Sequence, residues 1–323
     1  MTHALITGGA GFIGSHLAEA LLAQGYTVTL LDNLSTGNRE NVAPLLGAQA
    51  RLVVEDVRHA LVLDRWMSEC DVVFHLAAMV GVQRILQQPV STIKVNIGGT
   101  EAVLDAAQRY HKKVLIASTS EVYGKGVSFP FNEDDDTRLG PSLRSRWSYA
   151  ASKAIDEFLG FAYHAEFGLP VVLFRLFNTI GPRQQGQYGM VVPRFMQWAL
   201  KNEPIQVYGD GEQQRCFCNV KDAVQGIIAL SQAEAAVGQV FNIGSQEEVT
   251  IRQLAERVKE RSGSTSEIRL IPYNEAYDDD GFEDFRRRVP GIEKTRQMVK
   301  WEATTSLDTT LDQMIDYYHQ RGI

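Results

Sequence analysis

A tyrosine and a lysine lie four residues apart in the segment Ser148-Tyr149-Ala150-Ala151-Ser152-Lys153, which has the composition of a helix start. On a helix this spacing brings both side chains to one face. A phenol with a pKa near 10 is a poor base at neutral pH, but nearby positive charges stabilise its phenolate. Lowering that pKa to about 7 requires about 4 kcal/mol. Because such pairs also occur by chance, the rest of the chain must support a catalytic role.

The first residues form a pattern that binds phosphate groups. A short apolar strand is predicted at residues 3–7, a glycine turn at 8–14 and a helix at 15–24. Gly8, Gly11 and Gly14 let the backbone turn tightly and approach a pyrophosphate, which the unpaired N–H groups of the helix start can bind. Since glycine patterns are common, the confirming feature is an acidic residue at the end of the next strand.

Asp32 supplies that acidic residue, directly after a strand predicted at 27–31. A carboxylate at this position accepts hydrogen bonds from the adenosine ribose and repels a 2′-phosphate, which favours NAD over NADP. Further strands are predicted at 51–55, 71–76 and 113–117, with a long helix at 91–110. This alternation predicts an α/β fold with a doubly wound parallel Rossmann sheet, whose ligands bind at the carboxyl ends of the strands.

Beyond residue 176 the alternation becomes irregular, which indicates a smaller, interleaved C-terminal substrate-binding domain. We predict an NAD-binding domain at residues 1–176 plus 218–241, and a nucleotide-sugar-binding domain at 177–217 plus 242–323. The return of the chain to the smaller domain is placed at Asn242-Ile243-Gly244. Acidic runs at 134–136 and 278–280 are interpreted as solvated loops.

Composition excludes several classes of partner. The net charge of −7 over 323 residues gives no basic surface for nucleic acid or an anionic membrane. Cys70, Cys216 and Cys218 lack the spacing of a zinc site, so we expect no metal. No segment approaches 18 uninterrupted apolar residues, and no basic leader precedes the first strand, so we expect a cytoplasmic protein.

Three motifs occur in order along the chain: the glycine turn, the segment Ser118-Thr119-Ser120-Glu121-Val122-Tyr123-Gly124 at a strand end, and the Tyr149/Lys153 pair. Together they resemble the extended short-chain dehydrogenases/reductases that modify nucleotide sugars, over essentially the whole chain. The resemblance implies an NAD-dependent enzyme in which Tyr149 removes the proton from a sugar 4-hydroxyl while C4 passes a hydride to NAD⁺. Thr119 would hydrogen-bond the same oxygen, and Lys153 would also hold the nicotinamide ribose.

The resemblance also implies the binding residues, a small-molecule UDP-sugar substrate and a homodimer built from helices at 91–110 and 150–167. NAD would be tightly bound and regenerated in each turnover. The predicted cofactor contacts are Gly8, Gly11, Phe12, Ile13, Gly14, Asp32, Asn33, Ser35, Gly37, Asp56, Val57, Leu76, Ala77, Ala78, Asn96, Tyr149 and Lys153. The predicted substrate contacts are Asn178, Val192, Gln206, Tyr208, Arg215 and Arg288.

Arg286-Arg287-Arg288-Val289-Pro290, together with the preceding segment 281–285, is similar to the C-terminal arginine motif of the UDP-glucuronate decarboxylases. In that subfamily the arginine that matches Arg288 meets the sugar carboxylate. Once C4 is a ketone, the sugar is a β-keto acid with its carboxylate at C6, and such acids lose CO₂ readily. Ser120 and Arg288 would hold this carboxylate, and Glu121 would order the water or acid that protonates C5. Decarboxylation of UDP-glucuronate to UDP-xylose is therefore the favoured reaction.

Other reactions of the same family remain open. A 4,6-dehydratase has aspartate where this chain has Ser120, and a 4-epimerase of UDP-glucose or UDP-glucuronate has a small residue at the position of Glu121. The loop Ala77-Ala78-Met79-Val80-Gly81-Val82, however, is more similar to epimerases and dehydratases. A 5,6-dehydratase also uses a glutamate at position 121. A non-catalytic NAD-binding protein would be expected to have lost Tyr149, Lys153 or Glu121, and all three are present.

Overall fold

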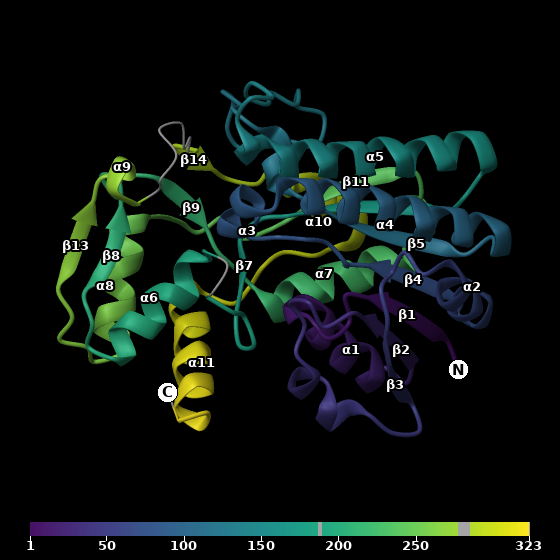
Figure 1. The fold of residues 1–323 in the computed structure, drawn as a ribbon, viewed down its shortest axis with the longest axis horizontal. Coiled ribbons are helices and arrows are strands. Elements are labelled where there is room, and N and C mark those ends of the chain that lie inside the picture. Colours follow the sequence, from purple (N-terminus) through teal and green to yellow (C-terminus); the bar gives the residue numbers. More distant parts are fainter. Residues whose placement is uncertain (187–188, 277–284, 323) are drawn as a thin grey trace.

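The centre of the computed structural model is a seven-stranded parallel sheet (Figure 1). The structure describes residues 1–186, 189–276 and 285–322. In spatial order the strands are β3 (Ala50–Val54), β2 (Thr27–Asp32), β1 (His3–Thr7), β4 (Val72–His75), β5 (Lys113–Thr119), β6 (Val171–Leu176) and β11 (Gln239–Ile243). The strand order reverses between β1 and β4, and ligands of doubly wound sheets bind at such a switch point. The predicted fold class is confirmed.

Helices cover both faces of this sheet, because its strands are apolar on both sides. One face carries α1 (Phe12–Ala23), α7 (Val220–Gln232) and α10 (Glu293–Val299), and the other carries α2 (Ala60–Glu69), α4 (Pro89–Tyr110) and α5 (Ser148–Phe167) (Figure 1). Leu17 and Ile227 are fully buried on the first face, and Val103 and Leu104 on the second. The sheet is therefore a rigid support for the loops at its carboxyl edge.

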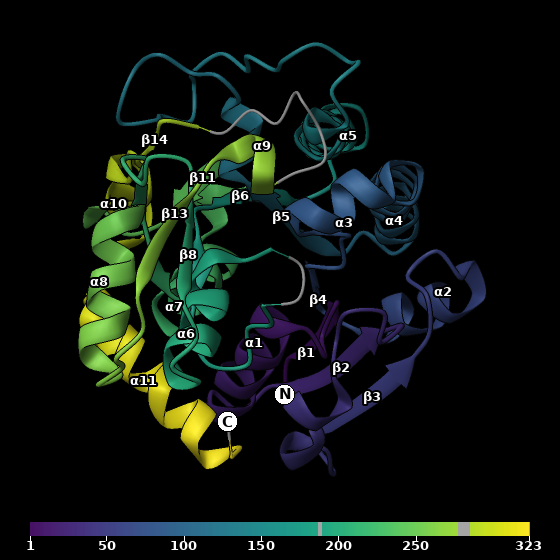
Figure 2. The same ribbon diagram turned by 60° about the vertical axis from the view of Figure 1, so that its left-hand side comes forward.

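A smaller region has its own apolar core. It contains α6 (Val191–Leu200), β8 (Ile205–Tyr208), β9 (Gln214–Cys216), β12 (Glu248–Thr250), α8 (Ile251–Arg261), β13 (Ile268–Ile271), α9 (Tyr273–Ala276), β14 (Arg287–Arg288) and α11 (Leu307–Gln320). Figure 2 shows α6, α8, α11, β8 and β13 on one side of the molecule, opposite β1, β2 and β3. Phe195, Val207, Leu254 and Leu311 are buried together there.

One difference from the sequence prediction concerns the end of a strand. Strand β11 continues past the predicted boundary at residue 241, and its Asn242 and Ile243 pair with Arg175 and Leu176 in the central sheet. The apolar run that feeds this strand ends only after Ile243, so these residues do not return to the smaller region. Residues 134–136 are exposed or half-buried, as expected, while the run at 278–280 lies outside the described residues.

The cysteines and the helices bear on the expected absence of a metal site and of a membrane span. All three cysteines are buried thiols. Among the residues that the structure describes, no helix combines the length and the apolar character needed to cross a membrane.

Candidate active site

A cavity of about 550 Å³ opens at the carboxyl ends of the central strands, beside the switch point. Most of the predicted cofactor residues line it: Gly8, Gly11, Phe12, Ile13, Gly14, Asp32, Asn33, Ser35, Asp56, Val57, Leu76, Ala77, Ala78, Tyr149 and Lys153. Thr119, Ser120, Glu121, Asn178 and Arg288 line the same cavity. Residues that are far apart in the sequence thus share one cavity, because parallel strands end at the same edge of the sheet.

The glycine turn fits a pyrophosphate. Gly8 has a φ of +71°, and a Cβ on Gly14 would lie 2.3 Å from the carbonyl oxygen of Gly8. Helix α1 begins directly after Gly11 with no side-chain cap, so the N–H groups of its first turn remain available to a ligand. Since these residues line the cavity, a phosphate group can lie against the helix N-terminus.

Asp32 ends β2 with its carboxylate buried at the edge of the cavity. One oxygen accepts a hydrogen bond from the N–H of Ala10 at 3.0 Å, and the other accepts from the N–H of Leu34 at 2.8 Å. Burial raises the pKa of Asp32, and these hydrogen bonds oppose the rise. Each carboxylate oxygen keeps a further acceptor site for a ribose hydroxyl.

Two predicted cofactor residues do not line the cavity, and both support it from behind. A Cβ on Gly37 would lie 2.7 Å from a carboxylate oxygen of Asp32, so the absence of a side chain there lets the loop pack against that carboxylate. Asn96, fully buried in α4, accepts a hydrogen bond from the N–H of Met79 at 2.8 Å and donates one to the hydroxyl of Ser152 at 3.0 Å. Asn96 therefore ties the loop after β4 to α5.

Tyr149 lies in the first turn of α5, where its phenol hydrogen-bonds to the side chain of Thr119. Thr119 is the last residue of β5, and its hydroxyl also accepts a hydrogen bond from the N–H of Glu121 at 3.3 Å. The strand end thus fixes the tyrosine and the threonine around one point in the cavity. The family resemblance implied that these two residues share one substrate oxygen.

The lysine of the pair has a partner that the sequence analysis missed. The ammonium of Lys153 donates to the carboxylate of Asp156 at 2.6 Å, and both side chains are almost fully buried. Burial raises the pKa of Asp156, while Lys153 opposes that rise. The spacing of three residues on a helix was the available signal.

The electrostatics of Tyr149 differ from the expected activation. In the protein alone its pKa is raised, first by burial and then by the negative charge of Glu121, while the hydrogen bond with Thr119 and the positive charge of Arg146 oppose the rise. Asp156 also raises it. The expected lowering of the pKa therefore does not come from the protein alone, because burial, together with the carboxylates near the phenol, raises the pKa of Tyr149.

Glu121 lies in a cluster of arginines. Arg146 donates to its carboxylate at 2.5 Å, and a guanidinium nitrogen of Arg288 lies 3.8 Å from the other carboxylate oxygen. Burial would raise the pKa of Glu121, but Arg146, Arg288 and Arg215 together lower it. Glu121 is consequently an ionised carboxylate at neutral pH, so it orders charged or hydrogen-bonding groups without itself carrying a proton.

Arg288 enters the site from strand β14. This strand pairs with β9 in parallel, which sets Arg288 beside Arg215. Arg288 is 7% exposed and donates to the hydroxyl of Ser120 at 3.2 Å. The guanidinium groups of Arg288 and Arg146 lie 4.4 Å and 5.1 Å from the centre of the Phe285 ring. An aromatic ring between them holds both cations in place through cation–π contacts.

Four of the remaining predicted substrate residues, Val192, Gln206, Tyr208 and Arg215, lie in the smaller region and do not line the cavity. Asn178 does line the cavity and donates to the carbonyl of Cys216 at 3.0 Å. Val192 is buried in α6, and Gln206 and Tyr208 belong to β8. The guanidinium of Arg194 lies 4.5 Å from the centre of the Tyr208 ring. Residues 281–284 of the predicted arginine motif lie outside the described residues.

Sequence reasoning also missed two arginines near the site. Arg146, three residues before Tyr149, is buried against Glu121, and Arg84 in α3 (Val82–Gln87) lines the cavity. An arginine just before a catalytic helix was a visible signal for Arg146. Arg84 had none, because its short helix follows an irregular loop.

The chain matches the family model described as GDP-mannose 4,6 dehydratase over residues 5–314. It is 40% identical to UDP-N-acetyl-alpha-D-glucosaminuronate decarboxylase of Bacillus cytotoxicus, with 98% of this chain and 97% of that protein covered. It is 37% identical to UDP-glucuronic acid decarboxylase 1 of Xenopus tropicalis, with 98% of this chain and 72% of that protein covered.

Among solved structures, the UDP-glucuronic acid 4-epimerase of Bacillus cereus, in complex with UDP-glucuronic acid and NAD, matches with a TM-score of 0.89. The two sequences are 28% identical, with 99% of this chain and all of that chain covered. Family model, relatives and solved structure agree over nearly the full length. The chain therefore belongs to the GDP-mannose 4,6-dehydratase-like family of extended short-chain dehydrogenases/reductases.

Proposed function

We propose that this protein is an NAD-dependent enzyme that decarboxylates a UDP-hexuronate through a 4-keto intermediate. The observation that carries the proposal is the placement of Arg288 and Ser120 in the cavity that also holds Tyr149 and Thr119. A guanidinium group binds a carboxylate through two parallel hydrogen bonds, so Arg288 suits the C6 carboxylate of the sugar. The relatives named above as decarboxylases support the same reaction.

The cofactor would be held by the turn at Gly8–Gly14, by Asp32 and by Lys153. When bound, NAD would supply the acceptor for a hydride from C4 of the sugar and the donor that restores it. Thr119 orients the 4-hydroxyl, and Tyr149 takes its proton and gives it back at the end of the cycle. NAD is tightly held, because it is regenerated in each turnover.

The carboxylate side of the cavity then determines which bond breaks. The 4-ketone allows the C5–C6 bond to break, so that CO₂ leaves and an enolate remains between C4 and C5. Ser120 and Arg288 hold the carboxylate before this step. Because Glu121 is ionised, it positions the water or acid that protonates C5 and does not donate the proton itself.

Two candidate substrates differ in the substituent at C2 of the sugar. One relative is named for UDP-N-acetylglucosaminuronate and others for UDP-glucuronate. The predicted product of UDP-glucuronate is UDP-xylose, and that of the acetamido sugar is the corresponding 2-acetamido pentose. Both share the carboxylate that Arg288 would bind.

A 4-epimerase is the second candidate. The loop at Ala77–Val82 and the similarity to a solved UDP-glucuronic acid 4-epimerase favour it. The buried cluster of Glu121, Arg146 and Arg288 favours decarboxylation, because epimerisation at C4 leaves C5 and C6 unchanged. A 4,6- or 5,6-dehydratase ranks third, and a non-catalytic NAD-binding protein fourth.

Proton NMR of the enzyme in D₂O with each UDP-hexuronate separates these candidates. A UDP-pentose with deuterium at C5 is the expected product, and the sugar that reacts faster identifies the C2 substituent. Formation of the 4-epimer supports the second candidate. Absence of any change with either uronate contradicts both.

Arg288→Ala is expected to reduce kcat/KM for decarboxylation by at least about 100-fold, which corresponds to about 2.7 kcal/mol. Bound NAD, measured by absorbance after denaturation, should be retained. Arg287→Ala is the matched control, because the Arg287 side chain, next to Arg288 in the sequence, is exposed and pairs with Glu248 at 2.6 Å. Undiminished decarboxylation in Arg288→Ala would remove Arg288 from the reaction.

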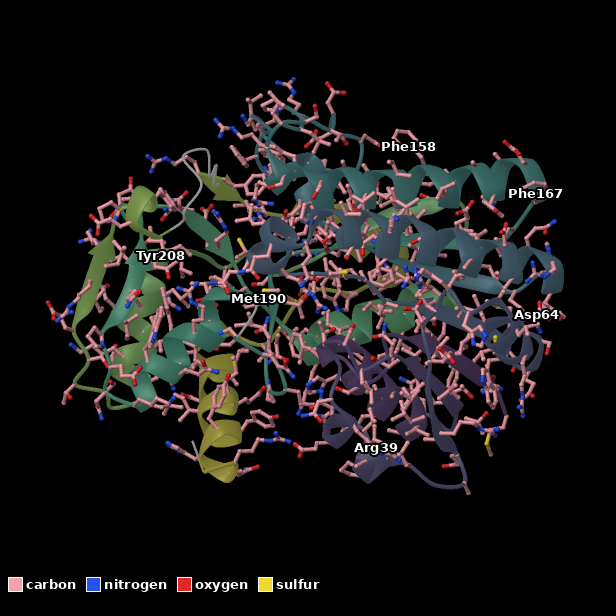
Figure 3. The ribbon with its side chains drawn as sticks, in the orientation of Figure 1. Arg39, Asp64, Phe158, Phe167, Met190 and Tyr208 are labelled. Carbon is pink, nitrogen blue, oxygen red and sulfur yellow. The ribbon has the colours of Figure 1, made fainter. Side chains whose placement is uncertain are left out.

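The domain division, the dimer and the cytoplasmic location stay predictions. The dimer is supported by the exposed apolar side chains of α5, where Phe158 is 75% and Ile155 42% exposed. Figure 3 shows Phe158 on the outer side of α5, pointing away from the rest of the molecule. Light scattering of the full chain measures the oligomeric state.

A further inference from the structure

A buried chain of polar groups extends from Lys153 into the protein behind the cavity. Asp156, which accepts from Lys153, is fully buried, and Thr100 of α4 opposes the rise in the pKa of its carboxyl. Its other carboxylate oxygen has no hydrogen-bond partner among the described residues. The hydroxyl of Thr100 lies 3.1 Å from Nε2 of His75, whose Nδ1 lies 2.8 Å from the hydroxyl of Thr7. A carboxylate at this depth is costly unless it compensates a charge.

We propose that Asp156 is a positioning residue that cancels the charge of Lys153, so that Tyr149 stays a neutral phenol until a second positive charge enters the site. This inference rests on the proposed role of Tyr149 as the base. Asp156 does not touch the sugar. It acts on Tyr149 by neutralising Lys153 and by the direct electrostatic effect of its own negative charge, which raises the pKa of the phenol.

The groups around the tyrosine support this assignment. From α5 itself, Lys153 and Asp156 face the phenol region as a pair 2.6 Å apart. From the end of β5 and the turn before α5, Glu121 and Arg146 form a second ion pair 2.5 Å apart. The Lys153–Asp156 pair is close to neutral as a unit, so it leaves no net positive charge for a phenolate, whereas Glu121 is shared between Arg146 and Arg288.

The elements packed behind the pair add little charge of their own. His75 of β4 is neutral, because burial and the nearby Lys153 lower its pKa to about 3. Glu157, the next residue of α5, is compensated by Arg175 at 2.7 Å. Arg288 on the far side pairs with Ser120 and Glu121. Asp156 is therefore the group whose removal would change the net charge beside Lys153.

Charge counting shows what this arrangement achieves. With Asp156 present, a phenolate at Tyr149 would leave the triad of Tyr149, Lys153 and Asp156 with a net charge of minus one. A bound cationic nicotinamide would bring that sum to zero, which a buried site favours. Without Asp156 the phenolate and Lys153 would already be neutral together. Asp156 would thus make the strength of the base depend on the oxidised cofactor.

Asp156→Asn tests this, because it removes the charge and keeps the size of the side chain. The readout is the ultraviolet absorbance of tyrosinate during a pH titration of the full chain, as purified with its cofactor and after cofactor removal. The chain has 11 tyrosines, so subtracting the same titration of a variant that also carries Tyr149→Phe isolates Tyr149. In Asp156→Asn the ionisation of Tyr149 should move to lower pH by about one pH unit or more, which is tenfold in proton affinity.

Two further variants act as controls. Asp156→Glu keeps the charge and should restore the wild-type titration. Glu157→Gln removes a buried carboxylate one residue along the same helix and should leave the ionisation of Tyr149 within about 0.3 pH unit. If Asp156→Asn does not fold, Asp156→Ser is the second neutral variant.

The acid limb of the activity profile of Asp156→Asn should move in the same direction as the tyrosinate titration. An unchanged ionisation of Tyr149 in a folded neutral variant, or a shift to higher pH, overturns the proposal. The titration uses no sugar substrate, so it can succeed even where the proposed decarboxylation fails. Failure of decarboxylation with a shifted titration would leave the role of Asp156 intact.

Discussion

Two consecutive carboxylates of α5 each form a buried ion pair, and the two pairs differ in where their cations lie and in how many hydrogen bonds those cations make. Asp156 pairs with Lys153 on the same helix, beside the cavity. Glu157 pairs with Arg175 on β6, away from it. Arg175 also donates to the hydroxyl of Tyr123 at 2.9 Å and to a backbone carbonyl at 2.9 Å, and both carboxylate oxygens of Glu157 accept from it.

The difference separates a structural pair from one available for chemistry. Every nitrogen of the Arg175 guanidinium donates to an acceptor, so this pair joins α5, β6 and the loop after β5 into one unit. The ammonium of Lys153 faces a cavity that a ligand can fill, and it keeps donors for that ligand. One helix therefore supplies both the support and the reacting group, from side chains that point in different directions.

The largest expected effect comes from breaking the structural pair. Arg175→Met should lower the free energy of unfolding by about 3–5 kcal/mol, because it leaves a buried carboxylate uncompensated and several acceptors without a donor. Urea unfolding measures the change. Lys153→Met should cost less, since Lys153 donates one hydrogen bond within the protein whereas Arg175 donates four. The double variant Arg175→Met/Glu157→Gln should recover part of the loss. Equal costs for the two single cation variants would erase the distinction.

A smaller effect should appear as a pH dependence on the side of Lys153. His75 has a folded-state pKa of about 3, whereas in the unfolded chain it titrates near 6.5. The unfolded state therefore binds more protons below pH 6.5, and stability is lost as pH falls toward about 3. The loss from His75 is up to about 1.4 kcal/mol per pH unit, or about 2 kcal/mol between pH 6.5 and 5.

His75→Gln keeps hydrogen-bonding groups near Thr7 and Thr100 and removes this titration. Urea unfolding at several pH values should show a flatter dependence in the variant than in the wild type. His16, whose pKa is lowered to about 4 mainly by burial, contributes in the same direction and is unchanged in both proteins. An identical slope in the two proteins would show that His75 is protonated or solvated in the folded state.

The smallest effect is expected at an exposed pair of the same length. Arg257 and Glu247 are 2.6 Å apart, the same distance as Lys153 and Asp156, but each side chain is 35% exposed. Arg257→Met should change the free energy of unfolding by only about 0–1 kcal/mol, because solvent screens the pair. A loss comparable to that of Arg175→Met would mean that distance matters more than burial.

The sequence predicted features that depend on local pattern. The turn at Gly8–Gly14 and the acidic end of β2 at Asp32 follow from strand ends meeting at one edge, whereas a shared role of Thr119 and Tyr149 was implied by the family resemblance. It could not predict which charges compensate each other. The expected lowering of the pKa of Tyr149 counted Lys153 as a free cation, and Asp156 was overlooked because an i, i+3 pair is normally a surface feature.

Two predicted cofactor residues lie outside the cavity lining for a different physical reason. Gly37 and Asn96 were expected to touch the cofactor, yet they shape the residues that line the cavity. A contact and a support are indistinguishable in a sequence, because both need a specific residue type at a fixed position. Strand β11 was cut two residues short at 241, since the change from sheet to smaller region has no turn residue before Gly244.

The pairing of β14 with β9 has a consequence for how the reaction could change. Alternate residues of a strand point to opposite sides, so a slip of one position would exchange Arg288 for its outward neighbour Arg287. Arg287 is tied to Glu248 at 2.6 Å, and the N–H of Phe131 bonds to the carbonyl of Val289 at 2.8 Å. These contacts fix the register of β14, and therefore which of its arginines faces the cavity. A single-residue insertion or deletion beside β14 would thus replace Arg288 by a different side chain in the cavity, without altering any residue of the Rossmann sheet.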